Sequence, residues 1–318
     1  MRRTLPVILA LLVVVAVGQA DAAGVVYEKN ANLDIAKRVQ TRLARSGVRI
    51  IMTRTSDRTA SLDSRTALAN ARGADAFVSI HNNARAGDAT ANWSEVYYQL
   101  RGGGSKTLAG SIGSALSRRL HTRDYLFTRR GDHGDYYHQL RTTKMPAVIV
   151  ESAFLTNRTQ ARLLATSASF RQSIADAIVD GILAYQKTLA KPAPLRAMDA
   201  GDRIELSQLP KPSAGRVVSA AARSVRLGWK PSDLPVGEIR VFRGSTLIAE
   251  LKAGSNSFTD NYTAPGQTYR YEIRTALKGP ADSVGESEPL AIIARTPAIL
   301  VCLDPGHGGS EAGAIGRY

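Results

Sequence analysis

The chain has 318 residues, of which 42 are Lys or Arg and 27 are Asp or Glu, giving a formal charge of +15 at pH 7. This length favours about two domains. A hydrophobic content of 44% with 22% charged residues excludes wholesale disorder. The one cysteine, Cys302, excludes an intramolecular disulfide and a CxxC zinc or redox site.

Residues 1–22 have the features of a secretory signal peptide. A basic start is followed by an apolar run over 7–17 and by the cleavage-site pattern Ala20-Asp21-Ala22. The run is shorter than the roughly 20 apolar residues that span a bilayer, although an uncleaved membrane anchor is the alternative. We therefore expect a mature protein that begins at Ala23, has no further transmembrane span and is secreted to the periplasm, cell wall or medium.

Most of the positive charge lies in the first large unit. Residues 22–200 carry 26 basic and 14 acidic side chains, whereas residues 201–296 carry 13 and 10. In the cytoplasm such a surface suggests nucleic acid, which we do not expect as a partner of an exported protein. Anionic wall polymers or lipid headgroups fit better, and the alternative is a surface that only keeps the protein in solution.

Residues 23–190 alternate buried strands with amphipathic helices, which is typical of an α/β fold with a largely parallel sheet flanked by helices. The pattern predicts, in chain order, a helix over 28–46, a strand over 48–54, a helix over 62–72 begun by Ser61, strands over 76–80 and 95–100, a glycine loop at 102–104, a helix to about 120, a strand over 147–150 and helices within 158–188.

Residues 191–199 form a Pro-containing linker, and 200–296 read as a small all-β sandwich of short alternating strands. The stretches SVRLGWKP, SFTDNYTAPGQTYRYEIR and SVGESEP resemble a fibronectin type III domain over about 214–294. This region offers no evident cluster of titratable groups, so we expect it to be a spacer or a protein-contact module.

The α/β pattern returns near the C-terminus. Residues 299–303 (ILVCL) form an apolar strand, and the glycine-rich turn DPGHGG follows over 304–309. Glycines allow the backbone to turn sharply there and leave room for a ligand. Asp304 can orient the turn that carries His307 or simply cap it.

Polar side chains follow three of the predicted strands. His81 follows 76–80, Glu151 follows 147–150, and His307 lies just past 299–303. The carboxyl ends of parallel strands converge on one crevice, where two histidines and a carboxylate can form a hydrolytic metal site. Zinc hydrolases use three nitrogen or oxygen ligands and lower the pKa of a bound water to about 7. A separate carboxylate must then take and return a proton.

Three stretches together resemble the zinc-dependent N-acetylmuramoyl-L-alanine amidases of the bacterial cell wall. They are CLDPGHGGSEAGAIG, MPAVIVESAFLTN, and the run from YEKNANLDIAKRVQ to ADAFVSIHNNA. The resemblance covers about residues 25–188 and 298–318. It implies that Glu28, His81 and His307 bind Zn2+ and that Glu151 is the catalytic carboxylate.

The same resemblance implies peptidoglycan as the substrate, cut between the lactyl group of N-acetylmuramic acid and the L-alanine of the stem peptide. Glu151 would take a proton from the zinc-bound water that attacks the amide carbonyl, and would return it to the departing nitrogen. Two other functions stay open. The chain can be a non-catalytic peptidoglycan-binding protein, or a zinc peptidase that cuts elsewhere in the stem peptide.

Other candidate groups have plainer interpretations. His121, His133 and His138 are expected to be solvated or hydrogen-bonded loop histidines. Cys302 lies within an apolar strand and is expected to be a small core residue. Glu28 opens a helix and can also simply complement the helix dipole. The chain has no HExxH motif, which excludes a zincin.

The order of the motifs departs from the family pattern. In the family the DPGHGG strand comes first, whereas here it comes last. A circular permutation explains this order, with 298–318 completing the catalytic unit of 23–190 and the sandwich joining the old termini. It predicts that residues 299–304 enter the same sheet and that Gly24 lies near Tyr318. The alternatives are a truncated second amidase domain and a scrambled gene.

Overall fold

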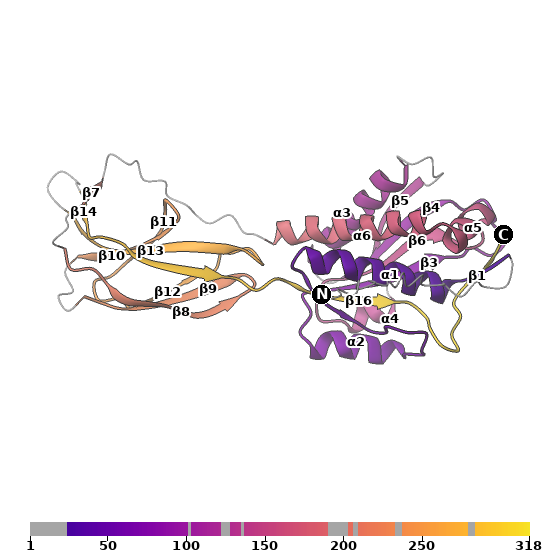
Figure 1. Cartoon of the computed structure of the whole chain (residues 1–318), viewed down its shortest axis with the longest axis horizontal. Coiled ribbons are helices and arrows are strands. Elements are labelled where there is room, and N and C mark those ends of the chain that lie inside the picture. Colours follow the sequence, from indigo (N-terminus) through magenta and orange to yellow (C-terminus); the bar gives the residue numbers. More distant parts are fainter. Residues whose placement is uncertain are drawn as a thin grey trace, which may run out of the picture.

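A computed structural model describes residues 24–100, 103–121, 128–134, 137–189, 203–205, 209–232, 237–278 and 284–318. The predicted signal peptide and linker lie outside these residues. The described chain forms an α/β unit and a separate β unit, each with its own hydrophobic core (Figure 1). Within the described residues, no helix combines the length and the apolar character needed to cross a membrane.

Six strands form the central sheet of the α/β unit. Four of the five strand pairings are parallel, and the pairing of β4 with β6 is antiparallel. Of these six strands, the one that comes last in the chain, β16, lies between β2 and β3 rather than at an edge. In spatial order the strands are β2 (Arg49–Met52), β16 (Leu300–Pro305), β3 (Ala76–Asn83), β6 (Ala147–Phe154), β4 (Trp93–Tyr98) and β5 (Thr128–Gly134).

Helices cover both faces of this sheet. Side chains alternate between the two faces along each strand, and both faces carry apolar residues that need cover. Val301 and Val78 belong to the larger core, whereas their neighbours Cys302 and Phe77 belong to the smaller one. Figure 1 shows α1, α3 and α6 on one side and α2 and α4 on the other. The helices are α1 (Glu28–Arg45), α2 (Leu62–Ala71), α3 (Gly103–His121), α4 (His138–Thr142), α5 (Arg158–Thr166) and α6 (Ala168–Thr188).

Two strands run past their predicted ends. β3 continues to Asn83 and β6 to Phe154, so His81 and Glu151 lie within strands rather than after them. The two residues are partners in the ladder between β3 and β6. The hydrogen bonds between paired strands join backbone atoms. A polar side chain therefore does not end a strand as long as the neighbouring strand still pairs with it.

The predicted glycine loop at 102–104 is wrong for its last two residues, because α3 begins at Gly103. A Cβ on Gly104 would lie 2.9 Å from Pro146 Cγ and 3.3 Å from the Tyr185 hydroxyl. The glycine therefore serves close packing inside the helix and not chain reversal.

The two ends of the described chain lie side by side. β1 (Val25–Tyr27) pairs antiparallel with β17 (Ile315–Arg317), and the Tyr318 N–H donates to the Gly24 carbonyl at 2.9 Å. The predicted proximity of Gly24 and Tyr318 is confirmed.

The β unit contains two sheets around a core that includes Leu227, Trp229, Val241 and Tyr271. One sheet consists of β8 (Ser213–Ala221), β9 (Ser224–Lys230) and β12 (Ser257–Asp260). The other consists of β7 (Arg203–Glu205), β10 (Glu238–Arg243), β11 (Thr246–Leu251), β13 (Thr268–Lys278), β14 (Val284–Glu286) and β15 (Leu290–Arg295).

The β unit does contain a cluster of charged side chains, contrary to the sequence prediction. Arg240 and Arg274 face each other across β10 and β13. Both are buried, and they contact the buried Glu286 carboxylate at 3.2 and 3.7 Å. The three residues come from three strands, so their proximity depends on strand pairing and is hidden in the linear sequence.

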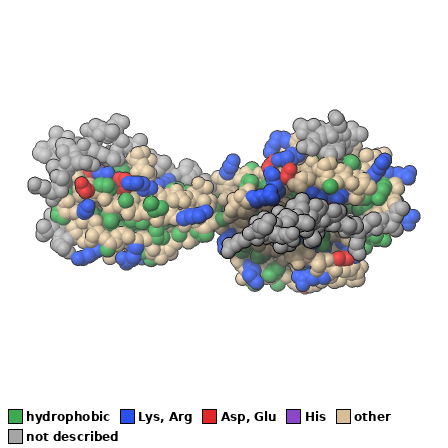
Figure 2. All heavy atoms as spheres, viewed as in Figure 1, with side chains coloured by type: hydrophobic (Ala, Val, Ile, Leu, Met, Phe, Trp, Pro, Cys, Tyr) green, Lys and Arg blue, Asp and Glu red, His purple; other side chains and the backbone are tan. Residues whose placement is uncertain are grey.

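Basic side chains are spread over the face of both units shown in Figure 2. Several in the α/β unit are engaged by acidic neighbours. Asp34 binds both Arg38 and Arg171 at 2.8 and 2.6 Å, and Asp180 binds Arg119 at 2.7 Å. Part of the excess charge is thus balanced locally.

Candidate metal centre

Glu28 is the first residue of α1, and its side chain is buried. Oε1 accepts hydrogen bonds from Asn32 Nδ2 at 3.1 Å and from the Asn82 backbone N–H at 3.3 Å. Oε2 accepts one from the Ala314 N–H at 2.8 Å. These donors come from three separate segments, so they fix the carboxylate in one orientation, which a helix dipole alone would not do.

His81 lies near the end of β3 and points its Nδ1 at this carboxylate, 2.9 Å from Glu28 Oε1. The turn after β16 passes directly over the imidazole. A Cβ on Gly306 would lie 2.0 Å from His81 Cε1, so a residue larger than glycine cannot take this place without displacing the ring.

His307 approaches the same carboxylate from the other side, with Nε2 3.2 Å from Glu28 Oε2. Its φ is 58°, a left-handed conformation that glycine favours and that costs other residues free energy. Reciprocal backbone hydrogen bonds between Gly308 and Glu311, at 2.9 and 3.1 Å, close the turn. The sequence pointed to flexible glycines here, but it gave no signal that His307 itself is left-handed.

The candidate ligand atoms of Glu28, His81 and His307 all lie within 4.8 Å of one another. Burial alone would raise the pKa of Glu28, but hydrogen bonds from His307 and His81 outweigh it and hold the pKa below its usual range. The hydrogen bond to Glu28 raises the pKa of His307, against the effect of burial. The site therefore favours an ionised carboxylate between two imidazoles.

Glu151 lies in β6, between His81 of β3 and Glu95 of β4. Its Oε2 is sealed from solvent and has no hydrogen-bond partner among the described residues. Burial, followed by the negative charges of Glu28 and Glu95, raises the pKa of Glu151 well above its usual value. The side chain is thus suited to hold a proton beside the three candidate ligands.

Glu95 is a member of this neighbourhood that sequence reasoning missed. Its buried carboxylate accepts hydrogen bonds from Trp93 Nε1 and from the Tyr97 hydroxyl, its two neighbours on the same face of β4. Trp93 in turn packs against Phe154, with ring centroids 4.7 Å apart. The sequence signal that could have identified Glu95 is its position between Trp93 and Tyr97, two residues away on each side, because both aromatic side chains can donate a hydrogen bond.

Asn32 and Asn82 were also missed. Asn82 Nδ2 donates to Asn32 Oδ1 at 2.9 Å, and Asn32 Nδ2 reaches the Gly306 carbonyl at 3.2 Å. Both asparagines are buried. The sequence signal that could have identified them is their position, since Asn32 lies one helical turn after Glu28 and Asn82 directly follows His81.

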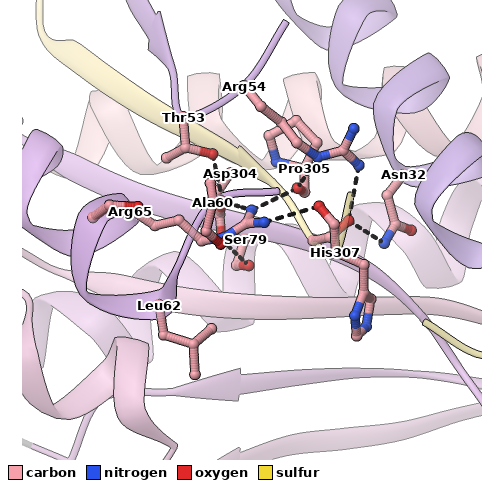
Figure 3. Close-up of polar contacts among 12 residues, drawn as sticks. Asn32, Thr53, Arg54, Ala60, Leu62, Arg65, Ser79, Asp304, Pro305 and His307 are labelled. Atoms are coloured by element: carbon pink, nitrogen blue, oxygen red, sulfur yellow. Dashed lines mark hydrogen bonds and ion pairs between the residues drawn. The ribbon is translucent and has the colours of Figure 1, made fainter. Parts of the chain in front are cut away.

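Of the two interpretations of Asp304, the structure supports the orienting role and corrects the turn cap. Asp304 lies in β16 rather than in the turn, and its carboxylate accepts hydrogen bonds from Thr53 Oγ1 at 2.5 Å, Arg65 Nη1 at 2.6 Å and Ser79 Oγ at 2.7 Å. Of these three donors, Arg65 also binds the His307 carbonyl, at 2.8 Å. Asp304 thus acts on the turn through Arg65 (Figure 3).

The remaining candidates lie elsewhere. His138 Nε2 is 2.8 Å from Asp63 Oδ1, between α4 and α2. The side chains of His121 and His133 lie outside the described part of the structure. Cys302 is fully buried, and burial raises the pKa of its thiol to about 12, which confirms it as a core residue.

The three donors fit a zinc ion. Two imidazole nitrogens with one carboxylate oxygen are a ligand set that zinc hydrolases use. Gly313 keeps the place beside them free because it has no side chain. A Cβ at this position would lie 2.6 Å from both Glu28 Oε2 and His307 Cδ2. The unpartnered oxygen of Glu151 supplies the further polar group that such a centre needs.

Known proteins share much of the α/β unit. The chain is 38% identical over 175 residues to the N-acetylmuramoyl-L-alanine amidase LytC of Bacillus subtilis, a match that covers 54% of this chain and 34% of LytC. It is 36% identical over 158 residues to the probable cell wall amidase LytH of Staphylococcus epidermidis, covering 50% of each chain. The chain thus spans between a third and a half of these two relatives.

The crystal structure of an N-acetylmuramoyl-L-alanine amidase from Clostridium difficile 630 is also similar, with 33% identity, a TM-score of 0.47 and coverage of 51% of this chain and 86% of that one. The family profile described as N-acetylmuramoyl-L-alanine amidase (Amidase_3) matches residues 15–184, more than half of the chain. That range contains Glu28, His81 and Glu151 and ends before His307. The chain belongs to the N-acetylmuramoyl-L-alanine amidase family.

Proposed function

We propose that this chain is a zinc-dependent amidase that cleaves peptidoglycan between N-acetylmuramic acid and the L-alanine of the stem peptide. The observation that carries the proposal is the meeting of Glu28, His81 and His307 within 4.8 Å. They come from a helix start, a strand and a turn that are far apart in the sequence, with Glu151 on the adjacent strand.

In this proposal each residue has a defined task. Glu28, His81 and His307 hold the ion, which when bound supplies a Lewis acid for the scissile carbonyl and activates water. The Glu151 carboxylate accepts a proton from the attacking water and later donates it to the leaving L-alanine nitrogen. The raised pKa of Glu151 supports its part as a proton carrier, because a carboxylate with a raised pKa is a stronger base toward the attacking water and can then pass the proton on.

We also propose that the catalytic unit is circularly permuted, with residues 298–318 completing 23–190. Two observations support this. β16 pairs with β2 and β3 in continuous register, and the pairing of β1 with β17 brings Tyr318 to Gly24. A compact unit with adjacent termini tolerates such rearrangement.

For the remainder of the chain we propose a secreted protein whose segment 200–296 is a fibronectin type III-like spacer or contact module. The two sheets around Trp229 and Tyr271 support the sandwich. Export to the periplasm or cell wall rests on the N-terminal sequence and agrees with a polymeric wall substrate. Anionic wall polymers would meet the basic side chains seen in Figure 2.

The test is metal removal combined with product analysis. We expect chelation to abolish hydrolysis of purified muropeptides and stoichiometric zinc to restore it, with free L-alanine amino termini as the new ends. Full turnover by a verified metal-free sample would contradict the proposal. New ends elsewhere in the stem would identify a peptidase, and binding without turnover would identify a non-catalytic wall protein.

A further inference from the structure

Two arginines are buried directly behind the turn that carries His307. Arg54 follows β2 and is fully buried, and Arg65 lies in α2 with 2% of its surface exposed. Burying a guanidinium group is unfavourable unless its donors are satisfied, so each arginine needs specific hydrogen-bond acceptors. Figure 3 shows both groups converging on the segment from Asp304 to His307.

Arg65 holds the end of β16 and the turn after it at three points. Nη1 donates to Asp304 Oδ1 at 2.6 Å and to the Pro305 carbonyl at 2.8 Å, and Nη2 donates to the His307 carbonyl at 2.8 Å. Nε donates to the Ala60 carbonyl at 2.9 Å, which ties the guanidinium to the start of α2. The planar guanidinium thus fixes the backbone on both sides of Gly306, at the Pro305 and His307 carbonyls.

Arg54 links the turn to α1. Its Nε donates to the Pro305 carbonyl at 2.8 Å, and its Nη2 donates to the Gly306 carbonyl at 2.9 Å and to the Lys29 carbonyl at 2.8 Å. Lys29 follows Glu28 and Gly306 precedes His307. One guanidinium therefore binds the immediate neighbours of two candidate ligands that come from opposite ends of the chain.

The contacts of Arg54 and Arg65 can stabilise the left-handed backbone conformation of His307. A left-handed residue other than glycine is strained and persists only where its surroundings impose that conformation. The carbonyls of Pro305, Gly306 and His307 are all held by the two arginines, while the imidazole extends to the opposite side of the backbone (Figure 3). The arginines therefore constrain the ligand's backbone without touching its ring.

We propose that Arg54 and Arg65 are positioning residues that keep His307 in its strained conformation and in register with Glu28, and thereby set the zinc affinity of the site. The inference rests on the proposed zinc function. Both residues hold the turn through its backbone carbonyls, and Arg65 also binds the Asp304 carboxylate, so they act on the His307 ring indirectly.

The experiment compares Arg54→Lys and Arg65→Lys in the full chain with a matched control, Arg171→Lys. Arg171 also binds one carboxylate, that of Asp34, and two carbonyls, those of Leu164 and Ala165. A lysine keeps the charge but cannot satisfy several fixed acceptors at once. Zinc affinity is measured by competition with a chromogenic chelator, ligand geometry by the visible spectrum of the Co2+-loaded protein, and folding by thermal unfolding of the metal-free protein.

We expect about 10- to 100-fold weaker zinc binding and a changed Co2+ spectrum in both arginine variants, with the control like wild type in both readouts. Equal affinity in folded variants would overturn the inference, as would a failure of both to fold, which would make the arginines general fold residues. If only Arg65→Lys fails to fold, Arg54→Lys decides. Wild-type protein that binds no zinc would instead refute the proposed function.

Discussion

Glu151 and Glu95 are partners across the ladder between β6 and β4, so two carboxyl groups share one small, shielded volume. They are held very differently. Glu95 accepts hydrogen bonds from Trp93 and Tyr97, whereas Oε2 of Glu151 has no such partner among the described residues. Burial and the neighbouring carboxylates raise the pKa of Glu151, so the Glu151 side chain is the one suited to carry a proton here.

We therefore predict that Glu151→Gln keeps zinc and fold but loses about 10²–10⁴-fold in turnover, the usual contribution of a general acid or base. The amide preserves the size of the side chain and removes its ability to carry the proton. Steady-state kinetics on muropeptides and zinc content measure the two effects. The exposed Glu311, on the His307 turn, offers the control Glu311→Gln. Loss of zinc in Glu151→Gln, or near-normal turnover, would count against this role.

Among the glycines of the turn that carries His307, Gly306 has the closest neighbour, because a Cβ there would lie 2.0 Å from the His81 ring. We predict that Gly306→Ala displaces that imidazole and lowers zinc affinity, measured by chelator competition. Gly103→Ala is the matched control, since a Cβ on Gly103 meets nothing within 4 Å. Unchanged zinc binding in Gly306→Ala would show that the ring can move without consequence.

At the scale of elements, β16 is a central strand supplied from the far end of the chain. Its removal would leave β2 and β3 with unpaired edges and take away His307. Exposed edges pair with other chains. The segment thus contributes to both the sheet and the site.

We predict that deleting 298–318 abolishes zinc binding and causes aggregation, measured by metal content and by size-exclusion chromatography. Adding the peptide 298–318 during refolding should recover part of the soluble, zinc-binding protein, which separates a missing strand from general misfolding. A truncated chain that stays folded, zinc-loaded and active would support a truncated second amidase domain in place of the permutation.

Much of the element pattern was predictable because apolar runs and helix signals are local. Ser61 caps α2 by accepting a hydrogen bond from the Ser64 N–H at 3.2 Å, as its position indicated. The pairing of β1 with β17 was not predictable in this way, since three-residue strands depend on a partner distant in sequence. The same holds for the contacts of Arg54 and Arg65, which exist only once β16 is in place.

At the scale of the whole molecule, the hydrogen bond from the Tyr318 N–H to the Gly24 carbonyl indicates that the two ends need no linker to join. We predict that a rearranged chain, with 298–318 placed directly before 24–190 and the β unit omitted, folds and binds zinc as tightly as the natural order. Thermal unfolding and chelator competition measure this. A rearranged chain that is unfolded would show that the α/β unit depends on the β unit.

The position of β16 also dictates when the catalytic unit can form. Domains generally fold as units while the ribosome extends the chain, at about 5–20 residues per second. Here β2 and β3 are synthesised long before the strand that joins them, and the β unit lies between. The sandwich can therefore complete its fold first. The candidate metal centre is complete only when synthesis has passed His307, so every earlier stage of the nascent chain lacks one of its three candidate ligands.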